Sequence, residues 1–144
     1  MGGVAKTYIG IDPGTHTGVA VKRGDEYISL LTTSIHKALD IVSQYADGCR
    51  ARGEELFIVF EDARQAHYHG RAMHSSARLQ GAGSVKRDCS IWEDFCLDKG
   101  IQFRATPPMY KYTKLTPESF RMMTGWDKPS SNHSRDAAML IIGL

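Results

Sequence analysis

Four residues from three separate segments have the types and spacing of a metal site: Asp12, Glu61, His133 and Asp136. Asp12 closes the run "YIGID" and Glu61 closes "LFIVFE", whereas His133 and Asp136 stand three apart, on one face of a predicted helix. Carboxylates suit Mg²⁺ or Mn²⁺. Two such ions about 4 Å apart can activate a water and stabilise the leaving oxygen of a phosphodiester. The residue types therefore point to metal-dependent chemistry on phosphodiesters.

Each of these residues also has a simpler explanation when it is taken alone. Asp12 can be the first residue of an Asp-Pro-Gly turn, and an acid at the end of a strand, such as Glu61, is usually solvated. His133 and Asp136 can simply be a pair in the first turn that interacts with the helix dipole, with Asp136 paired to Arg135 or another neighbour. The joint pattern favours a shared site, and carboxylates gathered in one cleft repel one another when no cation is bound.

The strands that must position these acids follow from short apolar runs. Residues 7–12 and 18–23 flank "PGTHT", which indicates a hairpin, and 25–33 adds a third antiparallel strand. The run 56–62 has the apolar character of a strand buried on both faces, so it is expected to pair parallel with an earlier strand after a crossover. A fifth strand, 101–108, stops at two prolines.

Four segments have helical signals. Apolar residues at three- and four-residue spacing predict a helix after Ser34 that stops at Gly53, and another over 75–99. Thr116 and Pro117 open a short helix, and a final helix is predicted from Ser131 or Asn132 to the end of the chain. The order predicts an α/β fold, a mixed five-stranded sheet with helices on both faces, in a single domain over 1–144.

The helix predicted over 75–99 contains Gly81 and Gly83, each of which lowers helix stability by about 1 kcal/mol relative to Ala. Glycines inside a helix usually mean that something packs very close. This helix is therefore our candidate for the contact with a second subunit, and burial against its own sheet is the alternative.

Charge and cysteine content are less specific. The net charge is only +2, but residues 99–121 carry five cations against Glu118, an excess that can follow a phosphate backbone or form a solvated face. Cys89 and Cys96 stand seven apart on one helix, roughly 10 Å along its axis and too far for a disulfide. We expect a reducing, cytoplasmic protein without a signal peptide or membrane segment.

Three motifs resemble one known family, in order and over nearly the whole chain. The segments "IGIDPGTHTG", "FIVFED" and "NHSRDAAML" are similar to the acid-bearing motifs of the RuvC-type Holliday junction resolvases of the ribonuclease H-like superfamily. The short length and "PPMYKYTKL" look more like bacteriophage members of that family. The resemblance implies a ribonuclease H-like sheet, three antiparallel strands followed by two parallel ones.

The resemblance also implies roles. Asp12, Glu61, His133 and Asp136 would bind Mg²⁺, with two ions per site and Mn²⁺ as a substitute. The protein would be a homodimer, built partly on helix 75–99, in which each subunit nicks one strand of a four-way DNA junction and leaves a 5′-phosphate. Lys111 or Lys114 takes the place of a family lysine near the scissile phosphate, where a cation stabilises transition-state charge. His133 either ligates the metal or positions water.

The segment "DARQAHYHGRAMH" is richer in His and Arg than we expect for the family. Tyr68 is our candidate for an aromatic side chain that stacks on an unpaired base. A zinc site at His67, His69 and His74 is disfavoured, because no cysteine is near and the spacing fits no common zinc motif. Phosphate contacts or a solvated face are the alternatives for five basic residues: Arg64, Arg71, Lys86, Arg87 and Arg104.

Three other functions compete with junction resolution. A related nuclease acting on flaps, forks or RNA–DNA hybrids uses the same acid cluster. An ATPase of the actin-like or sugar-kinase type is excluded by size and by the lack of a second phosphate loop, so no nucleotide cofactor is expected. A non-catalytic junction-binding module has no use for a complete acid set.

Overall fold

The computed structural model describes residues 5–66, 76–109 and 112–144. Its centre is one mixed sheet of five strands: β1 (Lys6–Asp12), β2 (Thr17–Arg23), β3 (Glu26–Thr33), β4 (Glu55–Glu61) and β5 (Gln102–Thr106). The order is β3-β2-β1-β4-β5, antiparallel from β3 to β1 and parallel from β1 to β5. The sequence-based prediction of the sheet is confirmed.

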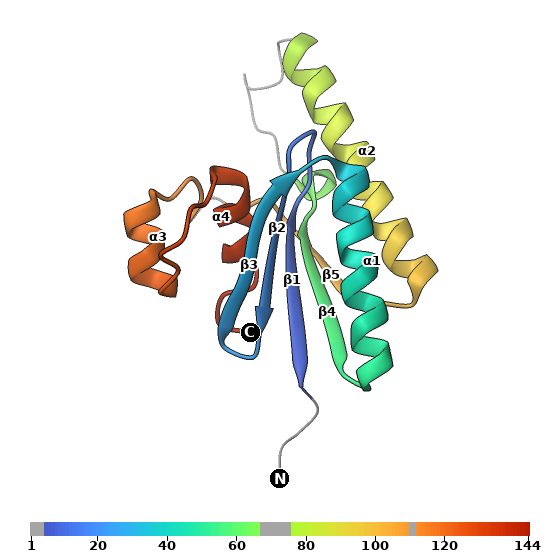
Figure 1. Ribbon diagram of the computed structural model, residues 1–144. Helices are drawn as coiled ribbons and strands as arrows, with labels where there is room; N and C mark the ends of the chain where they lie inside the picture. The colour runs from blue at the N-terminus through green and yellow to red at the C-terminus, as the bar shows by residue number, and fades with distance from the viewer. Residues whose placement is uncertain (1–4, 67–75, 110–111) are drawn as a thin grey trace.

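Helices cover both faces of this sheet (Figure 1). On one face lie α1 (Ile35–Arg52) and α2 (Ser76–Lys99), and a short 3₁₀ helix, η1 (Ala63–Gln65), joins β4 to the segment before α2. On the opposite face lies α4 (Asn132–Met139), with α3 (Pro117–Thr124) beside it. No described helix has both the length and the apolar character needed to cross a membrane.

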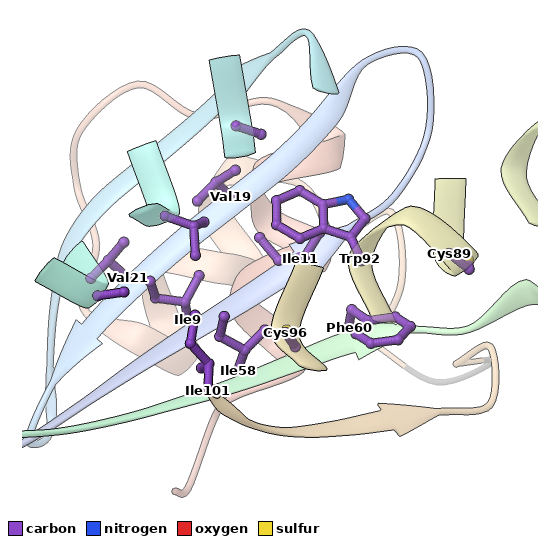
Figure 2. Packing of buried hydrophobic residues seen from close by; sticks show 13 residues of the cluster. Ile9, Ile11, Val19, Val21, Ile58, Phe60, Cys89, Trp92, Cys96 and Ile101 are labelled. Carbon is purple, nitrogen blue, oxygen red and sulfur yellow. The ribbon is translucent and has the colours of Figure 1, made fainter. Parts of the chain in front are cut away.

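The larger core lies between the sheet and the α1–α2 layer (Figure 2). Alternate residues of the strands point into it, and Trp92 of α2 is fully buried there. The Phe60 ring stacks on Phe103 of the neighbouring strand at 6.0 Å. Because β-strand side chains alternate, the residues between these, including Asp12 and Glu61, face α4 instead. The core therefore decides which face of the sheet carries the acids.

The helix boundaries agree with the sequence except at the last helix. α1 ends at Gly53, which has a left-handed φ of 66°, and Thr116 caps α3 by accepting the Ser119 N–H. α4, predicted to run to the end of the chain, stops at Met139. The following residues turn, with Gly143 at φ 79°, and Lys22 donates to the Leu144 carbonyl at 2.7 Å. This turn keeps Ile141 buried against the sheet.

Candidate metal centre

The position of Asp12 is set by the docking of α4 on the sheet. Asp12 is the last residue of β1 and pairs with Gly18 of β2. A Cβ built on Gly18 would lie 2.1 Å from the carbonyl oxygen of His133, and one on Gly10 would lie 2.0 Å from that of Ala137. Because the two glycines leave these spaces free, the α4 backbone rests directly on the strands. Its first turn thus reaches the end of β1.

His133 makes the contact that this docking allows. Its Nδ1 lies 3.1 Å from Oδ2 of Asp12, and the ring of His16, from the β1–β2 turn, has its centroid 6.1 Å from that of His133. The side chain of His133 is half exposed, whereas that of Asp12 is mostly buried. The imidazole therefore faces solvent on one side and orients the Asp12 carboxylate on the other.

Glu61 ends β4, the strand parallel to β1, one residue beyond the paired Ile11 and Phe60. Its Oε2 accepts a hydrogen bond of 3.4 Å from the Met109 backbone N–H. Burial and the nearby Asp12 charge raise the pKa of Glu61 from 4.5 to about 7, and the Asp136 charge adds to this rise. The two strand ends thus bring Asp12 and Glu61 together, as the sequence predicted.

Asp136 completes the group from α4. Its Oδ1 accepts a 2.8 Å hydrogen bond from the backbone N–H of Lys114. Burial raises the pKa of Asp12 from 3.8 to about 6; the hydrogen bond from His133 opposes this rise, and the Asp136 charge adds to it. Three acids from β1, β4 and α4 therefore act on one another electrostatically. A metal-free site of this kind holds its negative charge unfavourably.

The donor set fits a hard divalent cation. Asp12, Glu61 and Asp136 offer carboxylate oxygens, the ligands that Mg²⁺ and Mn²⁺ prefer. Burial, and after it repulsion from neighbouring acids, raises the pKa values of Asp12 and Glu61, and a cation would offset both effects. Within the described residues, no three acidic, histidine or cysteine side chains are already arranged as a ready-made metal site. In this side-chain arrangement each acid instead accepts a hydrogen bond from the protein.

Asp62, the acid next to Glu61, has a different role. It is almost fully buried and receives Arg64 on both oxygens, at 2.8 and 3.1 Å, while Arg64 also bonds to Glu93 at 3.1 Å. Although burial acts in the opposite direction, hydrogen bonds from Arg64 and Gln65 hold the pKa of Asp62 below its ordinary value. Two adjacent acids thus have opposite pKa shifts, and Asp62 is bound up in a structural ion pair.

The predicted DNA contacts are dispersed. Arg87 is exposed on α2, 3.8 Å from Asp88, and Lys86 precedes it there. Arg104 of β5 lies over the ring of Phe57, at 6.0 Å, and so is turned toward the start of β4, away from the acids. Arg64 is engaged with Asp62 and Glu93. Tyr68, Arg71 and Lys111 lie outside the described residues.

Sequence reasoning missed three kinds of contributor to the site: two glycines, two backbone N–H groups and one buried arginine. Gly10 and Gly18 interrupt strand patterns, and glycine inside a strand is a sign of close backbone approach. The backbone N–H groups of Met109 and Lys114 leave no trace in residue type. Arg135, treated only as a neighbour of Asp136, is buried and hydrogen-bonded to the carbonyl of Leu115.

Comparison with known proteins adds information on the fold. No model of a protein family matches the sequence, and no curated protein does. Among solved structures, the chain is similar to the RuvC structure from Thermus thermophilus, with a TM-score of 0.52 and 15% identity, over 94% of this chain and 91% of that one. The chain therefore has a ribonuclease H-like fold, as the three motifs led us to expect.

Proposed function

We propose that this protein is a metal-dependent endonuclease that resolves four-way DNA junctions. One observation carries the proposal: Asp12, Glu61 and Asp136 come from β1, β4 and α4, yet they lie close enough at one end of the sheet to interact electrostatically. The Asp136 charge acts on both Asp12 and Glu61, and the Asp12 charge acts on Glu61. The fold that brings them together resembles that of RuvC. The ion pair with Arg64 lowers the pKa of Asp62, whereas burial raises the pKa values of Asp12 and Glu61.

The three carboxylates would hold Mg²⁺, which supplies Lewis-acid chemistry and an activated water for phosphodiester hydrolysis. His133, bonded to Asp12 at 3.1 Å, fixes the direction of that carboxylate and would ligate the ion or position water. An ammonium group from Lys111 or Lys114 would stabilise charge on the phosphate in the transition state.

Cutting two strands of one junction needs two active sites. We propose a homodimer formed through α2, whose first half extends beyond the end of the sheet that carries Asp12 (Figure 1). A Cβ added to Gly83 of this helix would meet no neighbouring atom of the described chain within 4 Å, so that side of the helix is open. Lys86 and Arg87 follow on the same helix and are proposed phosphate contacts, as are Arg71 and Arg104, with Tyr68 stacking on a base.

The test is a panel of synthetic substrates: four-way junction, flap, fork, duplex and RNA–DNA hybrid, each with Mg²⁺, Mn²⁺ or EDTA. We expect paired nicks with 5′-phosphate ends in the junction, only with metal. Preferential cleavage of flaps, forks or hybrids would replace junction resolution with the related nuclease activity. Binding of the junction without cleavage in either metal would leave only a binding module and contradict the proposal.

A separate experiment addresses the dimer. Sedimentation at micromolar concentration is expected to give twice the chain mass, and a bulky charge at Gly83 (Gly83→Glu) is expected to shift the protein toward monomer. A wild-type protein that is strictly monomeric and still makes paired nicks would contradict the role given to α2.

A further inference from the structure

Two consecutive residues of α4 hold two consecutive residues of the segment before α3. Asp136 accepts the Lys114 N–H at 2.8 Å, and Arg135 donates from Nε to the Leu115 carbonyl at 2.8 Å. Lys114 has a φ of 53°, and Tyr112 one of 61°. A residue with a side chain adopts this conformation at an energetic cost, so surrounding contacts must hold it in place.

Arg135 makes the contacts that could hold this segment. Only 6% of its surface is exposed. Besides Leu115, its guanidinium donates to the carbonyl and hydroxyl oxygens of Ser130 at 2.9 and 2.8 Å and to Oδ1 of Asn132 at 2.7 Å. All four acceptors are uncharged, and no carboxylate of the described chain forms a salt bridge with it.

The placement of this cation is unusual for helix stability alone. Arg135 lies in the first turn of α4, where the helix dipole disfavours positive charge, and burial of a cation without an ionic partner is also unfavourable. The helix does not need Arg135 for its start, because Ser131 and Ser134 already form a reciprocal capping box. What Arg135 adds is the connection between α4 and Leu115.

We propose that Arg135 is a positioning residue for the metal centre: by holding Leu115 it keeps the Lys114 N–H on Oδ1 of Asp136 and so fixes the direction of this carboxylate. The inference rests on the proposed function, since it assumes that Asp136 binds metal. Hydrogen bonds to a ligating carboxylate orient it in the same way that hydrogen bonds to other metal ligands do, and their loss commonly changes metal affinity or activity by about 10–100-fold.

The test compares Arg135→Gln and Arg135→Lys with wild type and with Arg121→Gln, an exposed arginine of α3. In metal-free protein we expect amide exchange at Lys114 to accelerate at least about tenfold in both Arg135 variants. The Mn²⁺ dissociation constant, measured by calorimetry without DNA, should rise about 10–100-fold. On junctions, kcat should fall in the same range with KM little changed. Arg135→Lys should not restore the wild-type exchange rate, Mn²⁺ affinity or kcat, because one ammonium group cannot replace guanidinium donors that bond to separate acceptors.

The outcomes separate this inference from the proposed function. Unchanged Lys114 exchange in Arg135→Gln would overturn it, and so would faster exchange with unchanged Mn²⁺ affinity. Full rescue by Arg135→Lys would mean that charge alone matters and would also overturn it. If wild type binds no Mn²⁺ and cuts nothing, the proposed function fails, a result visible before any variant is made. If Arg135→Gln does not fold cooperatively, the comparison of Arg135→Lys with wild type decides.

Discussion

The carbonyl oxygen of His133 lies 2.1 Å from the position that a Cβ on Gly18 would occupy. Gly18 also pairs with Asp12 across β1 and β2. The close approach of the first turn of α4 to the Asp12 carboxylate therefore requires the absence of a side chain at Gly18. The hydrogen bond from His133 to Asp12 exists because the helix can approach this far.

The first prediction is that Gly18→Ala destabilises the protein by about 2 kcal/mol or more, since backbone atoms must move to admit a methyl group. Urea unfolding monitored by tryptophan fluorescence measures this. Gly48→Ala in α1 is the matched control, because its Cβ would meet only the flexible end of the Arg52 side chain and Ala favours a helix by about 1 kcal/mol. A Gly18→Ala protein as stable as wild type would contradict the close docking of α4.

The second prediction concerns pH. Burial raises the pKa of Asp12 from 3.8 to about 6 and that of Glu61 from 4.5 to about 7. Both carboxyls thus hold protons more tightly in the folded than in the unfolded chain, so their ionisation opposes folding. In EDTA, the contribution of these two groups should make the free energy of unfolding fall as the pH rises from about 4 to about 7.

This pH dependence has its own control. The double variant Asp12→Asn, Glu61→Gln should show a flatter profile between pH 4 and 7, because neither side chain can ionise. Mn²⁺ added at pH 7.5 should raise the free energy of unfolding of wild type and leave that of the double variant unchanged. A wild-type profile with the same slope through this range as that of the double variant would contradict the raised pKa values.

The third prediction separates two adjacent acids. Glu61→Gln should increase the stability of the metal-free protein at pH 7.5 and abolish cleavage, because it removes a charge that burial disfavours. Asp62→Asn should instead lower stability by about 2 kcal/mol, because it weakens the buried pair with Arg64. Urea unfolding of both variants in EDTA tests the contrast. Destabilisation of equal size in both would mean that Glu61 is structural too.

Much of this architecture could be predicted from the sequence, and the successes have a physical reason. "LFIVF" is apolar on both faces because β4 lies inside a sheet that helices cover on both sides. Its parallel pairing with β1 and the meeting of Asp12 with Glu61 could therefore be predicted. Local periodicity indicates which strand is buried, and chain order limits which strands can pair.

The rest depends on contacts that residue type does not encode. Lys114 contributes a backbone N–H to Asp136, and any residue but proline carries that group. The end of α4 at Met139 also went unpredicted, because "AAMLIIGL" is apolar throughout and only the tertiary packing of Ile141 favours a turn. Arg64, predicted to contact DNA, engages Asp62 and Glu93, partners that spacing alone did not indicate.

The most direct test of the central claim is single-turnover cleavage of a four-way junction by wild type and Asp12→Asn, with junction binding measured in parallel in Ca²⁺. Asn has nearly the same shape as Asp but lacks the negative charge that a metal ion requires. We expect at least a roughly 10³-fold loss of the cleavage rate, with junction affinity within about threefold of wild type. Cleavage by Asp12→Asn at the wild-type rate would contradict a metal centre built on Asp12.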